Sequence, residues 1–277
     1  MDDLVSTQWL AANLGQPGQV AVDSSVFMPS SGRDAGAEYL AAHIPGARFL
    51  DVEALSDKSN PAPHMLPSAV AFGRAMQDLG VDRDDQIIVY DNSPLRTAAR
   101  GWFMLRHFGA RQVAILDGGL QKWTSEGRAV ESGEPAPRQA RFEAAVRPGE
   151  VVSMADISAG LGVALIDARG NARFEGTEPD PRPGVAAGHI PGARNLPFAS
   201  LYKEDGTFRS RDEIAQTVAV AGADPHAPFV ATCGSGVTAN SLIFAAHLLG
   251  NRAVRLYDGS WSEWGADPTT PKDRGPA

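Results

Sequence analysis

Residues 42–48 read Ala-His-Ile-Pro-Gly-Ala-Arg, and the last six of these residues recur in the same order at residues 189–194. Neighbouring features repeat with them, and the offset between the copies stays between 141 and 146 residues. The further matched pairs are 20–23 with 164–167, 87–90 with 229–232, and 117–119 with 258–260. Because an internal repeat settles the domain count before any motif is considered, the chain is expected to fold as two copies of one unit.

Within each copy, short apolar runs alternate with stretches of helical periodicity. The expected strands are 86–90, 113–116, 229–232 and 253–256, and the expected helices are 68–79, 97–108 and 237–249. This alternation predicts an α/β fold in which each copy is a mostly parallel sheet with helices on both faces.

The boundary between the copies is expected at a stretch rich in proline. Residues 134–140 contain two prolines and show no amphipathic period, which is typical of a linker. The predicted domains are therefore residues 1–137 and 151–277, with residues 138–150 as the linker.

Composition narrows the class of protein. The 277 residues are 43% apolar and 21% charged, and they carry a net charge of −8, which disfavours nucleic acid and anionic lipid as partners. One cysteine permits no internal disulfide and no cysteine-rich zinc site. The N-terminus has no signal-peptide pattern and no stretch reaches 18 apolar residues, so a cytoplasmic location without a membrane span is expected.

The single cysteine, Cys233, opens the turn between the expected strand 229–232 and the helix after it. Gly234 and Gly236 permit positive φ angles and close backbone approach, and amide N–H groups at a helix start can point into such a turn. A helix N-terminus carries about half a positive charge, which favours a thiolate over a thiol. Cys233 is therefore predicted to be a nucleophile, with a buried apolar role as the alternative.

Features that only one copy possesses are the candidates for chemistry. Asp91 stands at the position that matches Cys233, so the first copy is expected to lack a nucleophile. Arg173 and Arg182 have no counterpart in the first copy, and two arginines beside an anion-binding loop can clamp a carboxylate. From the residues alone, an equally open alternative is that Arg173 and Arg182 are two solvated surface charges.

Features that both copies share are interpreted as structural. His43 and His189 are expected in turns or packing, and Trp123 and Trp264 in the cores. Arg169, close to Asp167, is expected to form a structural ion pair.

The doubled unit, the repeated segment and the sequence Cys-Gly-Ser-Gly-Val-Thr-Ala at residues 233–239 resemble the tandem rhodanese-domain sulfurtransferases, over essentially the whole chain. These loop residues are those of the branch that uses 3-mercaptopyruvate, whereas the thiosulfate branch typically carries Cys-Arg-Lys-Gly-Val-Thr. A thiosulfate dianion benefits from basic residues, and a keto acid with one carboxylate needs fewer. The resemblance implies two rhodanese-like domains, with Gly234, Gly236, Val237 and Thr238 binding the substrate.

The resemblance also implies roles outside the loop. Arg173 and Arg182 would hold the substrate's carboxylate and carbonyl. The family's His-Met-Leu-Pro segment places a histidine, here His64, beside the loop serine, here Ser235, and an aspartate completes the set. Glu53 stands at the aspartate's place, which departs from the pattern. Ser235 and His64 would relay a proton to the departing pyruvate enolate.

The expected activity moves sulfur from 3-mercaptopyruvate through a Cys233 persulfide to a thiol acceptor such as thioredoxin, or to cyanide, and releases pyruvate. No cofactor or metal is expected beyond the persulfide. The alternatives are a thiosulfate sulfurtransferase, which the missing basic residues disfavour, and a non-enzymatic sulfur carrier or binding module. A phosphatase is disfavoured because its cradle needs an arginine where this chain has Ala239.

Overall fold

The computed structural model describes residues 1–276 and contains two compact units. Unit 1 consists of residues 1–56, 66–147 and 203–208. Unit 2 consists of residues 57–65 and 148–202, together with the chain from residue 209 onward. Each unit therefore includes one short segment from the other half of the sequence.

This division differs from the expected boundaries. Most of the expected linker, up to residue 147, packs as part of unit 1. Arg138 forms an ion pair of 2.6 Å with Asp85, and Phe142 is buried against the ring edge of Phe72. An extended segment needs no helical period to bury one aromatic side chain, which is why its pattern resembled a linker.

Unit 1 is a parallel five-stranded sheet with helices on both faces. Its strands are β1 (Leu4–Val5), β2 (Gln19–Asp23), β3 (Arg48–Phe49), β4 (Gln86–Tyr90) and β5 (Gln112–Leu116), in the order β1-β5-β4-β2-β3. Its helices are α1 (Thr7–Asn13), η1 (Pro29–Ser31), α2 (Ala35–Ala41), α3 (Val52–Leu55), α4 (Ala69–Asp78), α5 (Ala98–His107) and α6 (Gly119–Ser125). Leu10, Tyr39 and Trp123 pack α1, α2 and α6 on one face of the sheet.

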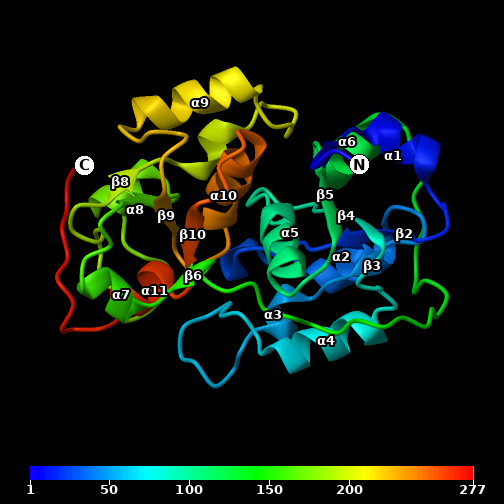
Figure 1. Cartoon of the computed structure of the whole chain (residues 1–277), viewed down its shortest axis with the longest axis horizontal. Helices are drawn as coiled ribbons and strands as arrows, with labels where there is room; N and C mark the ends of the chain where they lie inside the picture. Colours follow the sequence, from blue (N-terminus) through cyan, green and yellow to red (C-terminus); the bar gives the residue numbers. More distant parts are fainter. Residues whose placement is uncertain (277) are drawn as a thin grey trace. The chain divides into compact units, whose positions relative to one another are not determined.

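Unit 2 repeats this architecture. Its strands are β6 (Val151–Val152), β7 (Ala164–Asp167), β8 (Arg194–Asn195), β9 (Phe229–Thr232) and β10 (Val254–Tyr257), in the order β6-β10-β9-β7-β8. Its helices are α7 (Met154–Ser158), α8 (Asn171–Glu175), η2 (Phe198–Leu201), α9 (Arg211–Val220), α10 (Ala239–Leu248) and α11 (Ser260–Trp264). Figure 1 shows α9 and α10 on one side of this sheet and α7 and α11 on the other.

The α/β class, with two sheets each covered on both faces, confirms the fold predicted from the repeat. The expected strands and helices are all present, and their ends differ from the expected ones by at most two residues. His43 and His189 are buried, and each stacks on an aromatic ring of its own unit, with ring centroids 4.3 and 3.8 Å apart. Trp123 and Trp264 lie in the two cores. These shared residues are structural, as expected.

The position of β9 decides which loops meet in unit 2. This strand lies between β7 and β10, and its end is level with theirs: Thr232 pairs with Asp167, and Ala231 pairs with Leu256. The carboxyl ends of neighbouring parallel strands lie at one edge of a sheet. The segments that follow β7, β9 and β10 therefore converge.

Within residues 1–276, no helix has both the length and the apolar character needed to cross a membrane. The same residues contain no group of three or more His, Cys, Asp or Glu side chains placed to hold a metal ion.

Candidate active site

Cys233 lies at the carboxyl end of β9 and is 1% exposed. The segment after β10 fixes the backbone around it. Trp261 donates its N–H to the Cys233 carbonyl at 3.0 Å, and the hydroxyl oxygen of Ser260 accepts the N–H groups of Cys233 and Gly236, each at 3.1 Å. Ser260 has a φ of 50° and its Oγ lies 3.9 Å from the cysteine sulfur. Cys233 is thus held in a turn whose backbone is fixed by several hydrogen bonds.

Gly236 provides the sharp bend of this turn. Its φ is 72°, and a Cβ there would lie 2.5 Å from the carbonyl oxygen of Asp258, so a larger residue does not fit. After the bend, Val237 is buried, and Thr238 is the N-cap residue of α10 but makes no capping bond with its side chain. In the part of the chain that the structure describes, the amides of Val237, Thr238 and Ser235 donate to no protein acceptor. The loop therefore presents backbone donors near the cysteine.

The matching loop of unit 1 holds a carboxylate, that of Asp91, where unit 2 has the cysteine. The carboxylate of Asp91 accepts the N–H of Ser93 at 2.8 Å and that of Ala98 at 2.7 Å. The matching amides in unit 2 are those of Ser235, two residues after the cysteine, and Ala239, the first residue of α10. Ala98 is likewise the first residue of α5, and the unit 1 loop before it is one residue longer. Burial raises the pKa of Asp91, and the two amide bonds oppose that rise. An acidic group thus occupies in unit 1 the place of the cysteine in unit 2, which supports an anion-binding role for the loop.

Two arginines lie against this loop. A Cβ added at Gly234 would be 3.1 Å from Nη2 of Arg173 and 3.4 Å from Nη1 of Arg182. Asp180 bridges the pair, accepting from Arg173 Nη2 at 2.8 Å and from Arg182 Nη1 at 3.3 Å. The Asp180 side chain is 1% exposed, whereas the arginine side chains are 22% and 24% exposed. The guanidinium groups are thus held in place and still reach solvent, as a substrate clamp requires.

Arg169 has the different role that was expected of it. Its Nη2 lies 2.7 Å from Oδ2 of Asp167, both side chains are buried, and it also donates to the carbonyl of Gly188. Arg169 and Asp167 form a structural ion pair, since the buried guanidinium donates to both carboxylate oxygens and to the Arg173 carbonyl.

Ser235 connects the loop to His64, which lies in residues 57–65, the segment of unit 2 that comes from the first half of the sequence. His64 Nδ1 lies 2.8 Å from the Ser235 hydroxyl oxygen, which also accepts from Arg182 Nη2 at 3.0 Å. His64 has a φ of 62°, uncommon outside glycine, which points to a backbone held by its surroundings. Glu53 belongs to α3 of unit 1, so unit 2 itself contains the serine and histidine of the predicted set but not its acid.

Three residues near the cysteine were not predicted from the sequence. Asp180 lies between the two arginines in the sequence, and a carboxylate spaced between two guanidinium groups was a signal that could have identified it. Ser260 gave no such signal, because its importance depends on a backbone bend. Asn240 follows the loop in the first turn of α10 and donates to two loop carbonyls.

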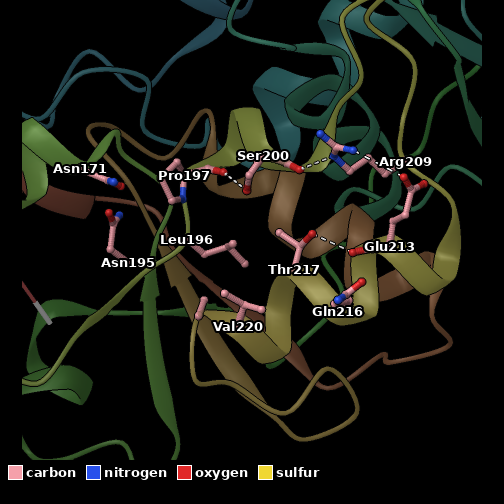
Figure 2. A pocket seen from close by; sticks show the side chains of 11 residues that line it. Asn171, Asn195, Leu196, Pro197, Ser200, Arg209, Glu213, Gln216, Thr217 and Val220 are labelled. Carbon is pink, nitrogen blue, oxygen red and sulfur yellow. Dashed lines mark hydrogen bonds and ion pairs between the residues drawn. The ribbon is translucent and has the colours of Figure 1, made fainter.

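Unit 2 also has a surface pocket of about 540 Å³ apart from this site. Figure 2 shows Asn195 and Pro197 on one side of it and Gln216 and Val220 of α9 on the other. It is lined by none of the residues that the sequence singled out. It is not the cysteine site.

Comparison with known proteins places the chain among well-described relatives. The model of the rhodanese-like domain matches residues 6–126 and again residues 151–267. A 3-mercaptopyruvate sulfurtransferase of Escherichia coli K12 is 42% identical over 96% of each chain. A thiosulfate sulfurtransferase of Bos taurus is 38% identical over 94% of this chain and 91% of its own.

Solved structures agree with this. The crystal structure of SseA from Escherichia coli, described as a 3-mercaptopyruvate sulfotransferase, has a TM-score of 0.86 and 40% identity, and the match covers 95% of this chain and all of that one. With two matched domains, a cysteine loop and full-length relatives, the chain belongs to the rhodanese-like domain family, as a sulfurtransferase with two copies of that domain.

Proposed function

We propose that this chain is a 3-mercaptopyruvate sulfurtransferase whose catalytic residues lie in unit 2. The observation that carries the proposal is the pair Arg173 and Arg182, held by Asp180 against Gly234 next to the cysteine. Two guanidinium groups can bind the carboxylate and carbonyl of an α-keto acid, while the loop itself adds no charged side chain.

In the first half-reaction, the Cys233 thiolate attacks the thiol sulfur of 3-mercaptopyruvate. An S–S bond forms as the carbon–sulfur bond breaks, and its electron pair stays on carbon as the pyruvate enolate. The product on the protein is a cysteine persulfide. Loop amides such as those of Ser235 and Ala239 are placed to stabilise the negative charge, as their counterparts do for the Asp91 carboxylate.

The enolate must take up one proton to leave as pyruvate. Ser235 is the candidate donor, because its hydroxyl contacts both His64 and Arg182. With Arg182 donating to the oxygen, the serine proton can pass to the enolate while the imidazolium form of His64 replaces it from Nδ1 and is left as neutral imidazole. Glu53 as a third member stays a prediction.

In the second half-reaction, a thiol acceptor such as thioredoxin, or cyanide, takes the outer sulfur and restores the Cys233 thiolate. No cofactor is needed for either step, since the persulfide carries the sulfur. We expect the reaction to take place in a reducing compartment such as the cytoplasm, where a lone cysteine stays available.

The proposal is tested by turnover with pyruvate release as the readout. Wild-type protein should release many equivalents of pyruvate from 3-mercaptopyruvate when a thiol acceptor is present, and mass spectrometry should detect one added sulfur on Cys233 when it is absent. Cys233→Ser should abolish both signals.

Each other outcome has a definite meaning. Release that stops after one equivalent, with acceptor in excess, would identify a sulfur carrier. A higher kcat/KM for thiosulfate than for 3-mercaptopyruvate would assign the chain to the other branch. Retained turnover in Cys233→Ser would end the covalent mechanism.

A further inference from the structure

Asn240 makes an unusual pair of contacts in the first turn of α10. Its side chain is fully buried, and its Nδ2 donates to the carbonyl oxygens of Gly236 at 2.6 Å and Val237 at 3.0 Å. Both neighbours are acceptors, so the NH₂ group must face them. The side-chain amide therefore binds the backbone of the cysteine loop directly.

The other end of the same amide has no partner. Asn240 Oδ1 is buried, and no donor within residues 1–276 reaches it. A buried acceptor without a hydrogen bond is destabilising, and such groups in folded proteins call for an explanation. The explanation here lies in what the Nδ2 end does for the loop.

The Asn240 side chain replaces a bond that a regular helix would supply. In an α-helix the N–H of residue 240 would donate to the carbonyl of residue 236. Here it donates instead to the carbonyl of Val237, at 3.3 Å, and the Gly236 carbonyl is bonded by the side chain. The N–H of Gly236 is held by Ser260. The Gly236 residue is thus fixed through both its amide and its carbonyl.

Fixing these carbonyls also fixes the donors on the other side of the same peptide groups. A trans peptide is planar, and its C=O and N–H point in opposite directions. The Gly236 carbonyl shares a peptide with the Val237 N–H, and the Val237 carbonyl shares one with the Thr238 N–H. When Asn240 holds both oxygens on the helix side, both N–H groups are turned away from Asn240, and they have no protein acceptor within residues 1–276.

We propose that Asn240 is a positioning residue that, by holding the Gly236 and Val237 carbonyls, aims the Val237 and Thr238 amides at the anion carried by Cys233. This inference rests on the proposed function and assigns to it a residue that does not itself touch the substrate. Unit 1 provides an internal comparison, because the matching position is Ala99, and the loop there is held by the Asp91 carboxylate instead.

The test compares Asn240→Ala with Asn240→Ser, which differ by one hydroxyl. In a helix a serine can donate to the carbonyl four residues earlier, here that of Gly236. Asn240→Ala should lower kcat for pyruvate release by about tenfold with KM unchanged, a smaller loss than the ~100-fold that removal of a direct transition-state donor causes. Asn240→Ser should recover part of that loss.

Asn251 provides the matched control in the same unit. It is also buried, and its Nδ2 also donates to two backbone carbonyls, those of Pro225 at 3.0 Å and Ala227 at 2.9 Å. Asn251 Oδ1 also accepts the N–H of Ala253 at 3.0 Å, so Asn251→Ala should cost at least as much stability, and it should leave kcat unchanged. If it lowers kcat as much as Asn240→Ala does, the effect is general loosening and the proposal fails.

A substrate-free measurement separates this proposal from the proposed function. The rate of alkylation of Cys233 by iodoacetamide at a fixed pH should fall in Asn240→Ala, recover partly in Asn240→Ser and stay at the wild-type value in Asn251→Ala. Wild-type protein that fails to turn over 3-mercaptopyruvate would refute the function while this comparison still decides the role of Asn240. Equal alkylation rates in all four proteins would overturn the positioning role.

Discussion

Replacing Asp23 by Asn is expected to make unit 1 more stable at neutral pH and to remove the part of its pH dependence that comes from this carboxyl group. Asp23 ends β2 and is 2% exposed. Its Oδ1 accepts from the N–H and the hydroxyl of Ser25, and these bonds lower its pKa, but burial outweighs them and raises the pKa from 3.8 to about 7. The neighbouring charge of Asp91 acts in the same direction as burial.

The size of the effect follows from this shift. A rise of about 3 pKa units corresponds to about 4 kcal/mol, since each unit is about 1.4 kcal/mol. The folded protein keeps the proton up to about pH 7, whereas the unfolded chain loses it near pH 3.8. The folded state therefore binds more protons within this window, and the free energy of unfolding falls as the pH rises through it. Asn does not ionise, so the stability difference between Asp23→Asn and wild type should grow by up to about 4 kcal/mol from acidic to neutral pH.

The assay must report unit 1 alone, because a chain with two units need not unfold in one step. Hydrogen exchange read by mass spectrometry, as a function of denaturant, gives the unfolding midpoint of peptides from β2 and β4. Asp205→Asn is the control within unit 1, because hydrogen bonds from Thr207 lower the pKa of Asp205 to about 2. Its contribution has the opposite sign and disappears only below pH 3.8. A stability difference for Asp23→Asn that is the same at pH 5 and pH 8 would refute the reasoning.

Two further predictions concern substrate recognition. Arg173→Ala and Arg182→Ala should each lower kcat/KM for 3-mercaptopyruvate by a factor equivalent to about 1.5 to 3 kcal/mol. The loss for Arg182→Ala should include kcat, because Arg182 also contacts Ser235. Wild-type steady-state kinetics in both variants would show that the two arginines are surface charges. The double change Gly234→Arg with Ser235→Lys should raise the ratio of kcat/KM for thiosulfate over 3-mercaptopyruvate by at least about tenfold, or 1.4 kcal/mol. A Cβ at position 234 would lie 3.1 Å from Nη2 of Arg173, so this flexible side chain must also shift slightly. An unchanged ratio with cyanide as the common acceptor would place donor specificity outside the loop.

Much of the fold was predictable because it depends on local pattern. The repeat, the alternation of apolar runs with helical stretches, and the Cys233 loop between β9 and α10 are all written in short segments. The proximity of Arg173 and Arg182 to the loop was also anticipated, since features limited to one copy mark the chemistry. The catalytic roles of these residues stay predictions.

The rest depends on contacts between residues far apart in the sequence. The buried carboxylate of Asp180 and the bend at Ser260 acquire their roles only from the direction of neighbouring groups. Asn240 could be placed on a helix from its pattern, but the carbonyls that it holds belong to a turn whose geometry no local rule specifies. The membership of residues 57–65 in unit 2, and of residues 203–208 in unit 1, is likewise set by tertiary packing.

The packing of residues 57–65 in unit 2, and of residues 203–208 in unit 1, affects how the protein can be divided into fragments. The borders of the sequence repeat and the borders of the two compact units do not coincide. A fragment that starts at residue 151 contains Cys233 but omits His64, so its Ser235 lacks the imidazole that contacts it in the intact chain. Any fragment cut at the border of the sequence repeat therefore removes a segment that packs in the unit it keeps.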